Sequence, residues 1–316
     1  MLTTEPTLND IRQASARIRP HAHWTPVVRC RTLDEITGVS LFFKCENLQK
    51  VGAFKFRGAC NAVLSLSEEE ASHGVATHSS GNHAQALALG ARMHGIHATI
   101  VMPSNAPDVK RAAVAGYGGE IVLCEPTLQA REESLAAVVG KSGAVAIHPY
   151  NNYDVIAGQG TASLELLEEV PALDAILVPV GGGGLLSGTL IAGKGISPRI
   201  KIIAVEPEGA DDAYRSWKAG EIIPMVGPKT VADGLLTSLG DKTFPIIQRL
   251  VDEIVTVSDE AILKAMKLIW ERAKLVVEPS GAVPLGALLE GKVDLSGKKV
   301  GIILSGGNVD FGRFGG

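Results

Sequence analysis

Short apolar runs alternate along the chain with longer stretches in which apolar residues recur every three to four positions. The short runs are predicted strands, at residues 41–45, 74–78, 98–102, 120–124, 144–148, 174–180, 200–205 and 299–304. The longer stretches are predicted helices, at residues 7–18, 83–94, 106–115 and 128–139. This alternation is typical of βαβ units and indicates parallel sheets with helices on both faces.

The predicted strands form two series, one before and one after residue 150. We therefore expect an α/β fold with two open, mostly parallel twisted sheets and a cleft between them. Ligands of such sheets bind beyond the carboxyl ends of the strands. The loops that follow strands are where functional residues are expected.

Composition and charge narrow the choice of partners. The 316 residues are 46% hydrophobic and 20% charged, as in ordinary globular proteins. A net charge of −4 and only 4% aromatic residues argue against nucleic acid. The four cysteines have no paired spacing, which favours neither zinc nor disulfides and is typical of the cytoplasm. We expect no signal peptide and no membrane span, because no apolar run is long enough.

Lys55 lies between two phenylalanines in the stretch Gly52-Ala-Phe-Lys-Phe-Arg-Gly58. Desolvation disfavours a charged amine, so these neighbours indicate an amine that is neutral or covalently engaged, and hence nucleophilic. The alternative is a lysine at a helix start whose stem lies on apolar surface and whose amine reaches water.

The loop after the strand at 74–78 is rich in small polar residues and reads Thr77-His-Ser-Ser-Gly-Asn-His83. Backbone N–H groups and short polar side chains at a helix start form a nest for a carboxylate or a phosphate. The alternative is a simple helix cap, but a cap needs only one such residue.

Four successive glycines follow the strand at 174–180, namely Gly181, Gly182, Gly183 and Gly184. They let backbone N–H groups approach an anion closely, and the next helix favours phosphate there. A dinucleotide motif G-x-G-x-x-G, with Glu206 as the ribose ligand, fails because its third glycine would fall on Leu186 or Ser187. The spacing suits a single phosphate.

Ser305 follows the last predicted strand and is a weak signal by itself. A nucleophilic lysine, a phosphate cradle and a polar nest at strand ends together describe an enzyme that uses pyridoxal 5'-phosphate (PLP).

The chain resembles the fold-type II PLP enzymes, most closely the serine racemases and the related threonine/serine dehydratases. The resemblance runs nearly end to end, and its motifs include Gly52-Ala-Phe-Lys55, Thr77-His-Ser-Ser-Gly-Asn-His83, Ala157-Gly-Gln-Gly-Thr161, Val178-Pro-Val-Gly-Gly-Gly-Gly184, Glu206-Pro207, Glu278-Pro279 and Leu304-Ser-Gly-Gly-Asn308. It departs from the family at Ala53, where serine or threonine is common. It implies a large domain at 1–72 plus 152–316 and a small domain at 73–151.

The resemblance also implies a role for each matching residue. Lys55 holds the cofactor covalently and removes the Cα proton of the substrate. The cofactor contacts are Phe54, Asn82 at the ring hydroxyl, Ser305 at the pyridine nitrogen, and Gly181, Gly182, Gly183 and Gly184 at the phosphate. Weaker candidates for the substrate carboxylate are Ser79, His83, Arg131 and Thr237. A neutral serine moderates the electron sink, which favours elimination or proton return over transamination.

Ser80 matches a family position on the cofactor face opposite Lys55, which predicts both racemase and dehydratase activity on serine and possible elimination from threonine. An alternative is a dehydratase of L-threonine and L-serine, or of threo-3-hydroxyaspartate, without significant racemisation. A different class is a non-catalytic PLP-binding protein. An NAD-dependent dehydrogenase, the third class, would lack the visible absorbance of lysine-bound PLP.

By the same resemblance, Glu206, Asp212 and the main-chain carbonyl of Ala210 are candidate ligands of a structural Mg²⁺, Mn²⁺ or Ca²⁺. The alternative is a solvated acidic turn. The expected assembly is a homodimer, and ATP, which mammalian serine racemases bind at a subunit interface, stays an open question. The chain stops within eight residues of Asn308, so we expect no C-terminal regulatory domain and no isoleucine feedback.

Overall fold

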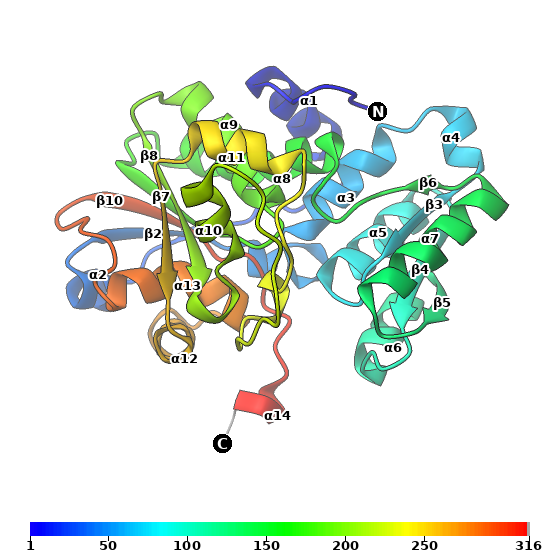
Figure 1. Ribbon diagram of the computed structural model, residues 1–316. Helices are drawn as coiled ribbons and strands as arrows, with labels where there is room; N and C mark the ends of the chain where they lie inside the picture. Colours follow the sequence, from blue (N-terminus) through cyan, green and yellow to red (C-terminus); the bar gives the residue numbers. More distant parts are fainter. Residues whose placement is uncertain (315–316) are drawn as a thin grey trace.

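Two lobes, each built on its own sheet, make up the computed structural model, which describes residues 1–314 (Figure 1). The large lobe has a six-stranded sheet in the order β1-β2-β10-β7-β8-β9, and the small lobe a four-stranded sheet in the order β5-β4-β3-β6. All neighbouring strands are parallel except β1, which is antiparallel to β2. The predicted fold class is confirmed.

The strands of the large sheet are β1 (Val27–Val28), β2 (Ser40–Lys44), β7 (Ala175–Pro179), β8 (Lys201–Pro207), β9 (Glu253–Val257) and β10 (Lys299–Ile303). Those of the small sheet are β3 (Val75–His78), β4 (Ala98–Pro103), β5 (Glu120–Cys124) and β6 (Val145–Ala146). Strand β6 is shorter than the predicted 144–148, and β1 and β9 were not predicted.

The α-helices are α1 (Leu8–Ile18), α2 (Arg31–Thr37), α3 (Lys55–Leu64), α4 (Glu68–Ser72), α5 (Asn82–Met93), α6 (Asp108–Gly116), α7 (Leu128–Ser142), α8 (Tyr153–Glu169), α9 (Gly184–Ile196), α10 (Asp212–Ala219), α11 (Thr243–Leu250), α12 (Asp259–Leu268), α13 (Pro279–Leu289) and α14 (Phe311–Phe314). Short 3-10 turns precede α3, at Glu46–Leu48 and Lys50–Gly52, and others lie at Glu208–Ala210 and Asp233–Leu235. A π-helical turn at Ile269–Ala273 follows α12.

Alternate residues of the large sheet enter two separate cores. Leu177 and Ile302 pack with α12 and α13, whereas Ile176 and Ile303 pack with α1, α8, α9 and α11. This division follows from the two-residue period of a strand, and it explains why these strands are apolar throughout. Figure 1 shows the two groups of helices on opposite sides of the sheet.

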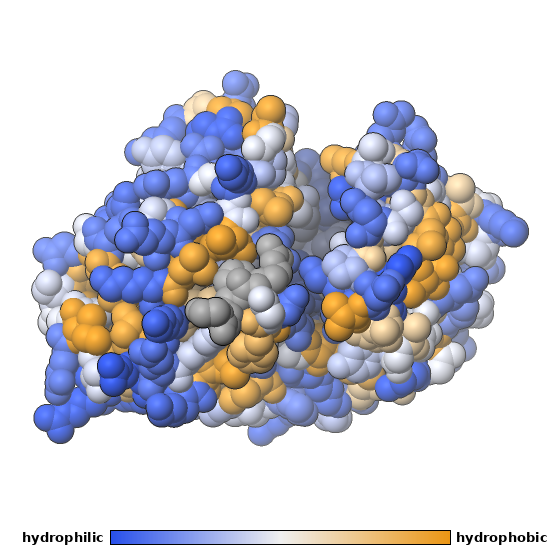
Figure 2. Space-filling model, turned by 90° about the horizontal axis from the view of Figure 1, so that it is seen from below, coloured by the Kyte–Doolittle hydropathy of each residue, from blue (hydrophilic) through white to orange (hydrophobic). Residues whose placement is uncertain are grey.

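Helix α3 joins the lobes. Its residues Phe56 and Ala59 share a core with β3, β4 and α5 of the small lobe, while Gly58 packs closely against Val155 and Gln159 of α8. The domain boundaries at residues 72 and 152 therefore stay a prediction, since the cores are not divided along them. Seen from below, the surface is hollowed between the two lobes (Figure 2). Among the described residues, no helix combines the length and the apolar character that crossing a membrane requires.

Candidate active site

Lys55 is the first residue of α3, and the backbone in front of it is tied to the end of β10. Phe54 N donates to Ser305 O at 3.0 Å, and Ala53 bridges to Gly306. Parallel strands present their carboxyl ends at one edge, so residues that are 250 positions apart meet there. The lysine and the predicted partner of the pyridine nitrogen are thus neighbours.

The Lys55 amine is partly buried at this edge. Its Nζ donates to Pro149 O at 2.9 Å and lies 5.1 Å from the centre of the Phe54 ring. Burial lowers the pKa of Lys55 to about 8, against an opposing effect of the Glu278 carboxylate. The neutral, nucleophilic amine is therefore accessible near neutral pH.

Helix α3 is fixed by a buried cluster of charges around Arg57, two residues after the lysine. Its guanidinium donates to both oxygens of Glu46, at 2.7 and 2.9 Å, and to both oxygens of Glu165, at 2.6 and 2.7 Å. Lys44 pairs with Glu165 at 2.7 Å and is fully buried. Two cations and two carboxylates balance, so the cluster holds the first turn of α3 without leaving a buried charge unpaired.

Glu278 is a functional candidate to which the sequence analysis gave no role. Its carboxylate accepts from Asn82 Nδ2 at 3.0 Å and from Asn308 N at 3.2 Å, so it links the nest of the small lobe to the large lobe. Burial raises the pKa of Glu278 to about 7, although the hydrogen bond from Asn82 lowers it. The available signal was an acidic residue before Pro279 at the start of a helix.

The glycine loop lies between β7 and α9, and Gly183 is the N-cap of α9 with φ +87°. A Cβ on Gly182 would lie 2.3–2.4 Å from three atoms of the Tyr150 ring, so only glycine fits beside this ring. The first backbone N–H groups of α9 have no helical acceptor, and the helix dipole favours an anion there. This cradle suits a phosphate group.

Ser80 does not cap α5. The N-cap is Gly81, and no side chain makes a capping hydrogen bond there. The hydroxyl of Ser79 accepts from Gly81 N at 3.3 Å. The alternative of a capping serine at position 80 is therefore wrong.

The three other substrate candidates occupy different settings. His83 is buried, its Nε2 lies 3.1 Å from Ile147 O, and within residues 1–314 its Nδ1 has no partner. Arg131 on α7 binds Thr127 O through Nε and lies near enough to help lower the pKa of His78. Thr237 is exposed beside Gly181. A direct contact of these residues with a substrate stays a prediction.

Three rings that meet edge to face, His78, His148 and Tyr150, lie near the site and were not predicted from the sequence. The His78 and His148 ring centres are 5.8 Å apart, and those of His148 and Tyr150 are 4.5 Å apart. Burial lowers the pKa of His148 to about 4, and its Nδ1 accepts from Asn151 N at 3.0 Å. His148 is thus a neutral imidazole close to Lys55. A short loop after a two-residue strand gave no sequence signal for this arrangement.

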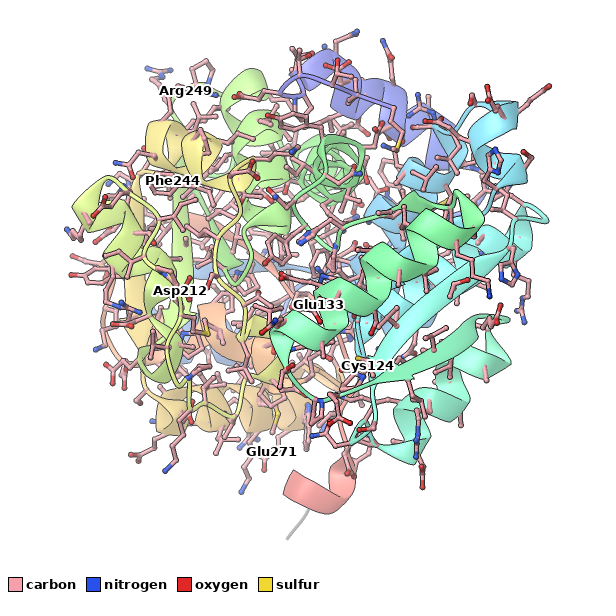
Figure 3. The ribbon with its side chains drawn as sticks, turned by 45° about the vertical axis from the view of Figure 1, so that its right-hand side comes forward. Cys124, Glu133, Asp212, Phe244, Arg249 and Glu271 are labelled. Carbon is pink, nitrogen blue, oxygen red and sulfur yellow. The ribbon has the colours of Figure 1, made fainter. Side chains whose placement is uncertain are left out.

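Glu206 lies near the end of β8 and Asp212 is the first residue of α10, in the large lobe, where Figure 3 labels Asp212. Glu206 accepts from the amides of Ala213 at 3.0 Å and Tyr214 at 2.9 Å. Both Asp212 oxygens are buried and make no hydrogen bond of normal geometry with the described residues, although the backbone N–H of Leu239 lies near enough to lower the Asp212 pKa. Burial and mutual repulsion raise the pKa of Glu206 to about 9, and burial raises that of Asp212 to about 7. Unpartnered carboxylate oxygens fit a hard divalent cation. Residues 1–314 hold no group of three acidic, His or Cys side chains for a metal, and this predicted site has only two.

The fold and these groups define the class: an enzyme with PLP in the cleft between two α/β lobes. The comparisons agree. The chain belongs to the family described as pyridoxal-phosphate dependent enzyme, whose model matches residues 18–306.

Several relatives are similar over almost the whole chain. A serine racemase of Dictyostelium discoideum is 53% identical over 310 residues, covering 96% of this chain and 95% of its own. A beta-hydroxyaspartate dehydratase of Paracoccus denitrificans is 51% identical over 308 residues, covering 98% of both chains. The structure of maize serine racemase superposes with a TM-score of 0.96 at 50% identity, covering 98% of this chain and 96% of that one.

Proposed function

We propose that this PLP-dependent enzyme racemises serine and also eliminates water from it, giving a 2-oxo acid and ammonia, with L-threonine as a further substrate for elimination. Two separate observations support it: the pKa of the Lys55 amine is lowered, and Ser80 does not cap α5. The serine racemase and beta-hydroxyaspartate dehydratase among the relatives support the same pair of reactions.

Bound PLP would supply an electron sink for the negative charge that develops at Cα. The cradle of Gly181, Gly182, Gly183 and Gly184 would hold its phosphate, with Ser305 at the ring nitrogen and Asn82 at the ring hydroxyl. Lys55 would take the Cα proton on one face, and Ser80 would return a proton on the other. Elimination needs only Lys55 and loss of the β-hydroxyl. The substrate carboxylate would be held by Ser79, His83, Arg131 and Thr237.

The second candidate is a dehydratase of L-serine, L-threonine or threo-3-hydroxyaspartate without significant racemisation. The relatives support this candidate too, because one of them is a beta-hydroxyaspartate dehydratase and another, from Saccharomyces cerevisiae, is an L-threo-3-hydroxyaspartate ammonia-lyase, 50% identical over 310 residues. Release of a 2-oxo acid from serine would exclude a protein that only carries PLP.

The proposed cation site consists of Glu206, Asp212 and the carbonyl of Ala210, with Mg²⁺, Mn²⁺ or Ca²⁺ as the ion. The two unpartnered, buried oxygens of Asp212 support it. The ion would order the loop after β8 and would not join the reaction, since the reacting groups are on other loops. We also propose a cytoplasmic homodimer, and leave ATP as a possible effector to direct binding measurements.

One experiment tests the activity directly. Purified PLP-loaded enzyme is incubated with L-serine, D-serine, L-threonine and threo-3-hydroxyaspartate, with and without EDTA, and the products are resolved by chiral chromatography. We expect D-serine and pyruvate from L-serine. Pyruvate without D-serine would favour the dehydratase, and turnover of hydroxyaspartate alone would favour the beta-hydroxyaspartate reaction.

A further inference from the structure

Thr243, the first residue of α11, joins that helix to the glycine loop. The side chain is fully buried, and its hydroxyl accepts from Gly240 N at 2.9 Å. Its one proton has Gly182 O at 2.9 Å as the nearer acceptor and Gly240 O at 3.2 Å as the other. The contact is tight, because a Cβ on Gly183 would lie 2.9 Å from Thr243 Cβ and 3.0 Å from Leu239 Cδ2. The segment 239–243 therefore forms the floor of the phosphate cradle.

The hydrogen bond to Gly182 O fixes the direction of an amide in the cradle. The carbonyl of Gly182 and the N–H of Gly183 belong to one planar trans peptide, so they point in opposite directions. Anchoring the carbonyl on Thr243 turns the Gly183 N–H to the other side. Gly183 is the N-cap of α9, where an anion is favoured.

Ser238, which directly precedes segment 239–243, is linked through hydrogen bonds to the main chain of Asp212. The Ser216 hydroxyl donates to Asp212 O at 2.6 Å and accepts from Ile223 N at 2.9 Å. Two residues further on, Met225 N donates to Ser238 Oγ at 2.8 Å. Leu239 and Ala213 also share one apolar core. Figure 3 shows Asp212 and Phe244, the neighbour of Thr243, in the same lobe.

We propose that Thr243 is a positioning residue: it holds the glycine loop in its phosphate-binding shape and couples cofactor binding to cation binding at Glu206 and Asp212. The inference rests on the proposed cation site. A cation removes the repulsion between the two carboxylates and so orders α10. Through residues 223–225 and Ser238, it also orders segment 239–243, which forms the floor of the cradle. Such coupling is reciprocal: the cation strengthens cofactor binding by the factor by which the cofactor strengthens cation binding.

The test compares Thr243→Val, which keeps the shape but loses the hydroxyl, with Thr243→Ser, which keeps the hydroxyl. Cofactor-free protein is titrated with PLP, followed by visible absorbance, with and without Mn²⁺. Free Mn²⁺ is measured by electron paramagnetic resonance, with and without PLP. We expect Thr243→Ser to behave as the wild type, and Thr243→Val to bind PLP about tenfold more weakly, as for one lost buried hydrogen bond, with the Mn²⁺ effect reduced to none.

Ser238→Ala keeps the cradle and cuts only the link to Met225. Without Mn²⁺ it should bind PLP as the wild type does, but Mn²⁺ should raise its PLP affinity less than in the wild type. Thermal unfolding of the unliganded proteins shows whether Thr243→Val folds, and Ser238→Ala replaces it in the test if it does not. The inference is overturned if Thr243→Val and Ser238→Ala both match the wild type in PLP affinity and Mn²⁺ effect. Asp212→Asn tests the cation site itself. If wild type and Asp212→Asn bind Mn²⁺ equally, or neither binds it, the cation site and the coupling both fail. The PLP affinity of Thr243→Val then tests only the role of Thr243 in the cradle.

Discussion

The behaviour of individual side chains in the cleft depends on what surrounds them. Lys55 has a lowered pKa because it is buried, and the nearby Glu278 carboxylate limits the effect. Ser80 differs from a capping serine only in that Gly81 takes the N-cap position, which leaves the hydroxyl available. Residue type alone would not have distinguished these roles.

Replacing Ser80 by alanine separates the two reactions. Racemisation needs a second proton donor, so Ser80→Ala should lower the racemisation rate by about 10²- to 10⁴-fold while elimination continues. The ratio of D-serine to pyruvate, measured in one reaction, is the readout. Ser79→Ala is the contrast: it should raise KM for both reactions and leave the ratio unchanged. An unchanged ratio in Ser80→Ala would contradict the proposed role.

The lowered pKa of Lys55 predicts the pH dependence of cofactor capture. Only the neutral amine attacks an aldehyde, so the rate at which cofactor-free protein gains visible absorbance should rise with pH and level off above a midpoint near 8. Because the Glu278 carboxylate raises the pKa of Lys55, Glu278→Gln should move the midpoint to lower pH. A midpoint near 10.5 would show a solvated amine instead. By linkage, the same shift should make stability rise with pH between about 8 and 10.5, where only the unfolded chain keeps this proton.

At the scale of elements, helix starts and the loops before them position the site. Helix α3 presents Lys55, α9 presents the glycine loop, and α5 presents the polar nest. Two of these helices are held by contacts on their other side: α3 by the Arg57 cluster, and α9 by Tyr150 and Thr243.

Removing the centre of the buried charge cluster should destabilise the protein strongly. Arg57→Met leaves Glu46 buried without a cation and leaves Glu165 with Lys44 alone. This should lower the free energy of unfolding by about 3–5 kcal/mol. Arg31→Met is the control, since the Arg31–Glu35 pair is exposed, and it should cost less than about 1 kcal/mol. Urea unfolding of cofactor-free protein measures both. Equal effects of the two substitutions would be inconsistent with the described cluster.

A methyl group at the second glycine should disturb the cradle. Gly182→Ala places a Cβ within 2.4 Å of the Tyr150 ring, so either the ring or the loop must move. We expect PLP affinity to fall by at least about tenfold, as measured by absorbance titration. Gly140→Ala has no atom within 4 Å of the new Cβ and should bind PLP normally. Normal binding by Gly182→Ala would mean that the ring gives way at little cost.

The sequence predicted elements with a clear period or a clear boundary. The helix predicted at residues 7–18 is α1, with Thr7 as its N-cap, and the strand predicted at 120–124 is β5. Helix α8 is buried nearly all round, shows no polar face and was not predicted. Helix α9 is buried in the same way, and the sequence predicted only that a helix follows the glycine loop, without its bounds. Lys55 was singled out because it lies between two phenylalanines, and Ser305 because it follows a predicted strand and matches the family motif; their roles stay predictions. Glu278, His148 and Tyr150 were given no role, because their role depends on contacts between segments far apart in the chain.

For the whole molecule, the two lobes meet through polar contacts across the cleft. Asn82 of the small lobe bonds Glu278 and Asn308, and Lys110 on α6 pairs with Asp233 at 3.2 Å. Exposed ion pairs contribute little energy, so the Lys110 pair leaves the lobes free to separate. The hydrogen bonds of Asn82 with Glu278 and Asn308 are a second connection between the lobes.

The order of strands in the large sheet has a consequence for biosynthesis. The last strand, β10, lies between β2 and β7, so both keep an unpaired edge until residue 303 has left the ribosome. Unpaired strand edges promote aggregation, so the nascent chain is prone to aggregate until β10 has been synthesised and has paired with β2 and β7. A chain truncated before residue 299 should therefore accumulate as an insoluble product, and recovery of a soluble fragment that captures PLP would show that the final strand is dispensable.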